Sequence, residues 1–598
     1  MALVAMSLCQ AGEPAVRPWW APAAGNMALL VAVDSSQPEE RALVDRTLLC
    51  ALDHFGMPFE LLDLAKAELS DKTLLTHPAV VMAQPDLGKR LSDRDISLLE
   101  QAVKSGVGLA NFDGNLSTYP SAYLRLLGVA SAKAARAASL RIAKPSHPIT
   151  AGSPQTDYQL VQPIEVTDPG HLSDAQVLLQ TDQGLPAAFT TRVGKGRIVQ
   201  FTLPTKLWLP NYFGHVHGLD GVFWKSIVWA ARKPFVMLAM PPFVAARIDD
   251  ASGSGSKFLI NGDSAAKSFR YIATLNRFGY RPNVGLFTDD IRDEDAPIIR
   301  EKFDHGLAEF SAHAWTEGRF IYLDRIRDRQ ETRMVEFTPE DLEQRFAKLD
   351  GQFAKWGVRP SKTLNCHCFN PGTNSLPFLK QRGETFMMFA GEFGKDYYDP
   401  SAFTWHPKPY GDPGLTLDYM PGHPDFFNVM AHPYKVSREG RISDADIDIL
   451  NGHTTFNHES PTNRLDAAVR RGTDAILLGL DSLFFGCLFA HEQRVASLTV
   501  SEWEKVLSDI DRATAQRERI FKNYDYISEY AKCRYDTKIV EASCDNASGK
   551  MRLKLVGKST LPLKLYRFSE DSLRYEFEEV PAFQGEQTVV LGRNTGSR

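Results

Sequence analysis

The sequence predicts an α/β protein in three successive regions: a parallel-sheet domain at residues 28–235, a distorted (β/α) barrel at 236–534, and a small β-sandwich at 535–598. Two series of short β-rich runs alternate with amphipathic helical stretches, which is the pattern of parallel strands covered by helices. After residue 535 the runs alternate without helices between them. A chain of 598 residues is also too long for a single hydrophobic core.

In the first region, the pattern predicts strands at residues 29–34, 58–62, 79–83 and 106–112 and helices at 38–55 and 92–105. From about residue 138 the spacing becomes β-dominated, and a helix is expected at 219–232. Residues 1–27 are interpreted as an apolar, disordered N-terminus or as the remnant of a secretory signal.

In the second region, expected strands alternate with helical patterns, which favours a barrel or distorted barrel of parallel strands. The helical patterns lie at 264–278, 294–305, 339–357, 373–382, 442–450 and 461–471. Strands are expected at 243–249, 282–287, 307–312, 362–367, 385–389, 427–431, 475–480 and 485–490. Residues 391–425, rich in Pro, Gly and aromatic residues, form a long insertion, and residues 501–530 are predicted to form one terminal helix. Long loops inside compact domains are usually functional.

The charge balance limits the classes of partner. Lys and Arg number 68 against 73 Asp and Glu, giving a formal charge of −5, which argues against a bulk nucleic-acid binder. No apolar run approaches the eighteen or so residues of a membrane span. The sequence leaves the oligomeric state open.

Two adjacent carboxylates end an apolar strand at Asp249 and Asp250, before a Ser/Gly-rich loop. Neighbouring strand residues point to opposite sides, so one acid can ligate a metal while the other accepts a proton. His313 ends a second strand, and if the chain then turns helical, Glu317 falls on the same face at i,i+4. Asp250, His313 and Glu317 would then form a three-ligand site for a divalent metal ion, with zinc the first choice.

Further strand ends carry imidazoles at His367, His432 and His491. In parallel-strand barrels the reactive groups lie at the carboxyl ends of the strands. His367 or His432 could replace Glu317 as the third ligand, or could line the substrate site together with Trp315.

The segments Arg247-Ile-Asp-Asp-Ala251, His313 and Phe485-Gly-Cys-Leu-Phe-Ala-His491-Glu resemble the metal-dependent polysaccharide deacetylases of the NodB homology type. The resemblance implies that Asp249 is the general base, that Asp250 and His313 bind the metal, and that His491 is the general acid. The sequence departs from the family at Glu317, where a second His is expected. The implied activity is removal of N-acetyl groups from an N-acetylhexosamine-containing polysaccharide, which favours an extracytoplasmic location.

The first region resembles the class I glutamine amidotransferase-like domains, which have a flavodoxin-like parallel sheet. Gly196-Arg-Ile-Val-Gln-Phe201 and Ile227-Val-Trp-Ala-Ala-Arg-Lys-Pro234 carry most of this resemblance. The turn that would hold the nucleophilic Cys is Asn111-Phe-Asp-Gly-Asn115, which contains no Cys, and Cys50 lies in a helical pattern. This domain is therefore expected to be catalytically silent.

Two other functions stay open. A glycoside hydrolase on a similar barrel would use Asp249 or Asp250 with another carboxylate and would survive chelation. A catalytically inactive, glycan-binding protein would bind sugar without turnover, and the departure at Glu317 keeps this alternative open.

Overall fold

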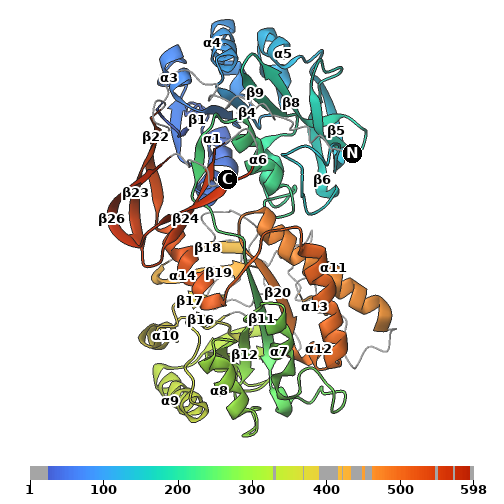
Figure 1. The fold of residues 1–598 in the computed structure, drawn as a ribbon, viewed down its shortest axis with the longest axis vertical. Coiled ribbons are helices and arrows are strands. Elements are labelled where there is room, and N and C mark those ends of the chain that lie inside the picture. Colours follow the sequence, from blue (N-terminus) through green and yellow to red (C-terminus); the bar gives the residue numbers. More distant parts are fainter. Residues whose placement is uncertain are drawn as a thin grey trace, which may run out of the picture.

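The computed structural model describes residues 25–327, 332–367, 370–388, 415–420, 422–431, 448–451, 461–545, 550–569 and 573–592. In Figure 1 the first nine strands and their helices lie at the top, the later helices and strands lie below, and the C-terminal strands lie beside the junction. The predicted α/β class is confirmed. None of the described helices is long and apolar enough to cross a membrane.

The N-terminal strands form one nine-stranded mixed sheet in the order β2-β1-β3-β4-β9-β8-β7-β5-β6. The first five strands in this order are parallel, and the other four pair in antiparallel fashion, as the β-dominated spacing after residue 138 indicates. The strands are β1 (Leu29–Val33), β2 (Phe59–Asp63), β3 (Ala79–Met82), β4 (Gly108–Asn111), β5 (Lys133–Ile142), β6 (Asp157–Asp168), β7 (Gln176–Thr181), β8 (Pro186–Val193) and β9 (Gly196–Phe201).

Helices accompany the parallel half of this sheet. Helix α4 illustrates why these segments are helical. Ser92 and Asp95 form a capping box at its N-terminus, and its apolar residues recur at helical spacing and are buried. The helices are α1 (Pro38–Val44), α2 (Cys50–Phe55), α3 (Asp71–Thr76), α4 (Asp93–Lys104), α5 (Ser121–Leu127) and α6 (Asp220–Ala230), with a π-helical turn at Asp45–Leu49 joining α1 to α2.

The second region contains a parallel sheet in the order β13-β12-β11-β20, with β21 beside the start of β11. A separate four-stranded sheet has the order β16-β17-β19-β18. The strands are β11 (Phe243–Ala251), β12 (Asn283–Phe287), β13 (Glu309–Ala314), β14 (Leu323–Arg327), β15 (Thr332–Glu336), β16 (Thr363–Leu364), β17 (Phe386–Met387), β18 (Leu415–Met420), β19 (His423–Ala431), β20 (Gly486–His491) and β21 (Ile520–Phe521).

The two sheets approach each other where β16 follows β13, and the Ser361 N–H donates a hydrogen bond of 2.8 Å to the Phe310 carbonyl. Within the described residues the strands do not close into one hydrogen-bonded barrel. The arrangement is therefore an open form of the distorted barrel, with the carboxyl ends of β11, β12, β13 and β20 at one edge.

The helices of this region are α7 (Arg270–Arg277), α8 (Ala296–Asp304), α9 (Pro339–Trp356), α10 (Leu376–Arg382), α11 (Pro461–Asp481), α12 (Glu492–Val495), α13 (Val500–Thr514) and α14 (Tyr524–Tyr535).

Two predictions of secondary structure in this region were wrong. Residues 475–480 belong to α11, where Ile476 and Leu480 are buried at i,i+4 spacing. The helix predicted at 501–530 is split, because Ile520 and Phe521 pair with β11 instead of continuing α13.

The C-terminal strands divide between two three-stranded sheets, β22-β23-β26 and β10-β24-β25. Strand β10 (Phe235–Met237) comes from the predicted boundary between the first two regions, so the C-terminal strands pack against that junction. The others are β22 (Lys538–Cys544), β23 (Met551–Ser559), β24 (Leu563–Phe568), β25 (Glu576–Val580) and β26 (Phe583–Leu591).

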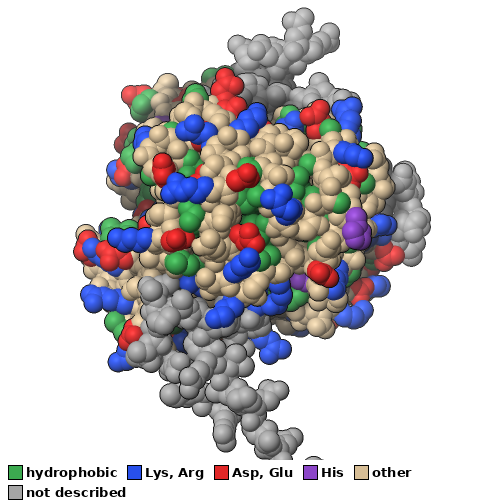
Figure 2. Space-filling model, turned by 90° about the horizontal axis from the view of Figure 1, so that it is seen from above, with side chains coloured by type: hydrophobic (Ala, Val, Ile, Leu, Met, Phe, Trp, Pro, Cys, Tyr) green, Lys and Arg blue, Asp and Glu red, His purple; other side chains and the backbone are tan. Residues whose placement is uncertain are grey.

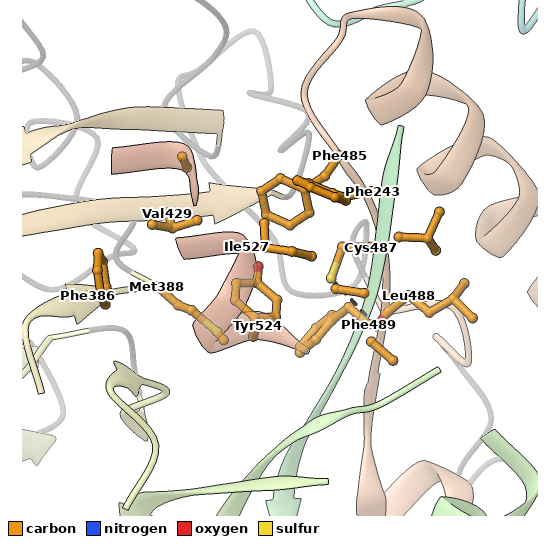
Figure 3. Packing of buried hydrophobic residues seen from close by; sticks show 14 of the residues in the cluster. Phe243, Phe386, Met388, Val429, Phe485, Cys487, Leu488, Phe489, Tyr524 and Ile527 are labelled. Atoms are coloured by element: carbon orange, nitrogen blue, oxygen red, sulfur yellow. Dashed lines mark hydrogen bonds between the residues drawn. The ribbon is translucent and has the colours of Figure 1, made fainter. Parts of the chain in front are cut away.

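Helix α14 fills the space between the two sheets of the second region. Figure 3 shows Tyr524 and Ile527 of α14 between Phe485, which precedes β20, and Met388, which follows β17. All of these side chains are buried in one apolar cluster. This core fixes the sheet edge that carries the acidic and imidazole residues.

The surface of the N-terminal end shows acidic and basic side chains interspersed, without a continuous field of one sign (Figure 2). This distribution agrees with the small net charge of the chain.

Candidate metal centre

Strand β11 carries Asp249 and Asp250 to the edge of the sheet. All nine of its residues are buried, and it lies between β12 and β20, with Asp249 paired in register with His491. The pairing with β12 is interrupted between Ile248 and Ala251, and Asp250 has a φ of 57°, in the left-handed region. The two carboxylates therefore enter different surroundings, as the sequence predicts.

Asp250 meets two histidines from neighbouring strand ends. Its Oδ1 lies 3.1 Å from His313 Nε2 and 3.2 Å from His367 Nδ1, and the two ring nitrogens are 3.0 Å apart. These three atoms belong to a group of described residues compact enough to hold a metal ion. Burial by itself would raise the pKa of Asp250, but the two imidazoles hold it well below its usual value.

The histidine orientation fits a cation. His313 Nδ1 lies 2.7 Å from the Asn365 carbonyl and donates its proton there, which leaves a lone pair on Nε2. Asp250 Oδ1 is buried and has no well-aligned hydrogen bond in the structure. Lone pairs this close repel unless a proton or a cation lies between them. One carboxylate and two imidazoles are a donor set that suits zinc.

Asp249 has a different environment. Arg247, two residues earlier on the same side of β11, donates from Nε to Asp249 Oδ1 at 2.7 Å and from Nη2 to Oδ2 at 2.5 Å. Asn365 donates to the same Oδ1 at 2.7 Å. Burial would raise the pKa of Asp249, but the Arg247 charge outweighs it, so the pKa is lowered. Asp249 therefore stays ionised.

The buried pair of Arg247 and Asp249 predicts a large stability effect. Arg247→Met leaves a buried carboxylate uncompensated, and we expect a loss of about 3–5 kcal/mol in the free energy of unfolding measured in urea. The control Arg277→Met removes an exposed pair with Glu504 and should cost less than about 1 kcal/mol. Adding Asp249→Leu to Arg247→Met should recover much of the loss. Equal effects of the two single changes would contradict this account.

His491 ends β20 on the other side of Asp250. Its Nε2 lies 4.0 Å from Asp250 Oδ2, and its Nδ1 lies 2.7 Å from Asp448 Oδ2. The His491 backbone N–H donates to the same Asp448 oxygen at 3.0 Å. Burial lowers the pKa of His491, but the hydrogen bond to Asp448 and the charge of Asp250 raise it to about 9. His491 is therefore protonated at neutral pH.

A polar cavity of about 350 Å³ opens beside this cluster and includes Asp250 in its wall. Gln493, which donates a hydrogen bond to Asp250 Oδ2, also lines it. Lys257 and Glu317 form an ion pair at 2.5 Å, and both side chains remain about half exposed or more. The cavity gives a polar ligand access to Asp250, one member of the group that could hold a metal ion.

The structure does not place Glu317 beside Asp250 and His313. Strand β13 ends at Ala314, and a tight turn follows in which Thr316 and Arg319 pair, so the helix that would align His313 with Glu317 does not form. The Glu317 carboxylate contacts Lys257 instead. The third member of the group is His367, the alternative that the sequence left open.

Two residues expected to contact substrate differ in their placement. Trp315 is buried in the core with the Lys348 ammonium 4.0 Å from its ring centroid, so its face is not available to a sugar. His432 and most of the 391–425 insertion lie outside the described residues.

Three residues that sequence reasoning missed hold the site together. Asn365 contacts both His313 and Asp249, Asp448 contacts His491, and Gln493 contacts Asp250. Gln493 and Asn365 had a local signal, because Gln493 follows His491 by two residues and Asn365 precedes His367 by two. Asp448 comes from a distant segment that the fold alone brings to this edge.

The end of β4 and the turn after it contain residues 111–115, the segment whose sequence lacks the Cys of an amidotransferase nucleophile. Cys50 lies in α2, and burial raises the pKa of its thiol to about 12, so it is not a reactive thiolate at neutral pH.

Comparisons with known proteins give weak similarities. No family model and no curated protein sequence matches the chain. A Parabacteroides distasonis protein provisionally named glycoside hydrolase/deacetylase is 11% identical, with 57% of this chain and 85% of that chain covered and a TM-score of 0.30. A cytoplasmic protein of Salmonella typhimurium is 14% identical over 35% of this chain and 100% of its own, with a TM-score of 0.27. A glutamine amidotransferase of Methylobacillus flagellatus is 10% identical over 34% of this chain and 76% of its own, with a TM-score of 0.21.

Proposed function

We propose that the protein is a metal-dependent hydrolase that removes N-acetyl groups from an N-acetylhexosamine-containing polysaccharide. The observation that supports this best is the buried Asp250 Oδ1 between His313 Nε2 and His367 Nδ1, with His491 on the opposite side. The sequence resemblance to polysaccharide deacetylases involves the same Asp250, His313 and His491. These three residues stand at the carboxyl ends of the parallel strands β11, β13 and β20.

Asp250, His313 and His367 would hold the ion, and zinc is the first choice for this donor set. A divalent ion bound there supplies Lewis-acid polarisation of a carbonyl oxygen and lowers the pKa of water. Asn365 keeps His313 in the tautomer that presents Nε2 to the site.

The chain's own residues supply proton transfer. Asp249 remains ionised and so can accept a proton, and Arg247 and Asn365 fix its orientation. His491 holds a proton and can deliver it to the leaving sugar nitrogen, which must be protonated before it departs as an amine. Asp448 orients the imidazole through Nδ1 and leaves Nε2 facing the site.

The polar cavity accommodates a saccharide unit. Lys257, Glu317 and Gln493 offer hydrogen-bonding groups for hydroxyls, and Phe258 and Phe287 offer apolar surface for the ring. Sugars present both kinds of surface, so this lining suits the proposed substrate.

The test is acetate release from N-acetylated polysaccharides before and after treatment with a chelator, with reducing-end formation measured in parallel. We expect acetate release to be abolished by chelation and restored by adding zinc. Reducing ends formed at an unchanged rate after chelation would instead identify a glycoside hydrolase. Sugar binding with neither product would identify an inactive glycan-binding protein.

A further inference from the structure

A second polar cavity, of about 280 Å³, lies in the N-terminal region. It opens at the carboxyl ends of the parallel strands β3, β4 and β9, and β5 and β6 form its opposite wall. Its lining includes Pro85, Asp113, Ser117, Ala134, Glu165 and Lys206. In open α/β sheets, ligands bind in the crevice outside the carboxyl ends of the strands. None of these residues belongs to the candidate metal centre, which lies in another sheet.

Asp113 is the buried polar group of this cavity, with only 2% of its surface exposed. Its carboxyl accepts one hydrogen bond from the Asn115 N–H and one from the Tyr119 hydroxyl, both at 3.1 Å. A carboxylate can accept about four hydrogen bonds, so this carboxyl, which belongs to a residue of the cavity lining, can accept further ones. No cation lies within ion-pair distance of it in the described part of the chain. Burial raises the pKa of Asp113 to about 7, so both protonation states are accessible near neutral pH.

The backbone around Asp113 is held firmly. Gln200 Nε2 donates to the Asp113 carbonyl at 3.1 Å, and Thr167 Oγ1 donates to the Gly114 carbonyl at 2.6 Å. A Cβ on Gly114 would lie 2.4 Å from the Thr202 carbonyl carbon, so only glycine permits this close approach. The carboxyl is therefore fixed in the cavity wall, as a preorganised binding group requires.

The remaining lining combines polar and apolar groups. Glu165 and Asp113 place carboxyl groups here, Lys206 and Ser117 add donors, and Leu43, Val166 and Pro204 are apolar. Two carboxyl groups with a single lysine disfavour phosphate, whereas hydroxyls can bond to all of these polar groups. The volume of about 280 Å³ lies just below the usual range for small-molecule sites, which is roughly 300–1,000 Å³. From this lining and volume, we propose that the cavity is a binding site for a single neutral saccharide unit, separate from the catalytic site.

Hydrogen–deuterium exchange of the full chain tests this site, because it shows which peptides are protected when a sugar binds. Glucose, galactose, mannose and N-acetylglucosamine are each added at high millimolar concentration. We expect at least one sugar to slow exchange in peptides covering residues 111–119 and 202–208. Ala134→Trp, on the exposed rim of the cavity, should abolish this protection by filling the space, and the matched control Ala134→Ser should retain it.

Protection that persists in Ala134→Trp, or no protection with any of the four sugars, would overturn the proposal. Asp113→Ala provides a second variant that should also lose the protection. His313→Ala should keep it, because His313 is remote from this cavity. A protein that releases no acetate but still shows the protection would disprove the deacetylase function and leave this site intact.

Discussion

Asp250→Ala and His313→Ala are each expected to lose bound divalent metal and to reduce acetate release by at least about 1000-fold. The buried Asp250 Oδ1 and His313 Nε2 are two of the three donor atoms, and removing either leaves too few to retain an ion. Loss of a preorganised electrostatic group at a reacting oxygen commonly costs about 100- to 1000-fold, and loss of the metal should cost more. Elemental analysis and acetate assays on the same samples measure both effects.

Two further variants separate the possible third ligands. His367→Ala should lose metal as the other two do, because His367 Nδ1 completes the group. Glu317→Gln should keep the full metal content, because the Glu317 carboxylate forms an ion pair with Lys257 and not with the candidate donors. Metal loss in Glu317→Gln with retention in His367→Ala would contradict this assignment.

His491→Asn is expected to reduce acetate release by about 100- to 10,000-fold without loss of metal, as is usual for removal of a general acid. In the proposed mechanism His491 supplies the proton to the leaving nitrogen, and it is not among the three candidate donors. A variant that loses metal and activity together would show that His491 is a ligand instead.

The same residue predicts a pH dependence. In the proposed mechanism the protonated form of His491 is the active one, so we expect activity to fall as pH rises through its pKa, which is about 9. Asp448→Asn removes the hydrogen-bonded carboxylate that raises this pKa, so the alkaline fall should move to lower pH. Initial rates across the pH range measure the shift. An unchanged alkaline fall in Asp448→Asn would show that another group controls it.

The sequence predicted the α/β class because strand and helix periodicities are local properties of the chain. The sequence-based prediction failed where tertiary contacts determine the secondary structure of a segment. Residues 475–480 have the apolar content of a strand but complete a helix packed on the core, and Ile520 and Phe521 leave a helical pattern to pair with β11. The open arrangement of the two sheets also depends on pairings between distant strands.

The sequence could predict those residues of the candidate site that directly follow a strand-like apolar run, because such residues can be placed at strand ends. Asp249, Asp250, His313 and His491 follow buried apolar runs, and parallel strands bring such ends together. Glu317 was misplaced because its role assumed a helix after His313, where a turn forms. Asn365 lies two residues before the candidate His367 and had a local signal that was not used. Asp448 could not be selected, because a single polar residue on a remote segment carries no periodic signal.

Binding of one divalent ion by Asp250, His313 and His367 can be observed by anomalous X-ray diffraction at the zinc edge, on crystals of the protein grown with zinc. We expect a single strong peak about 2.0–2.2 Å from one oxygen of Asp250 and one nitrogen of each histidine. No peak among these three residues, or an ion bound through Glu317 instead of His367, would contradict this expectation.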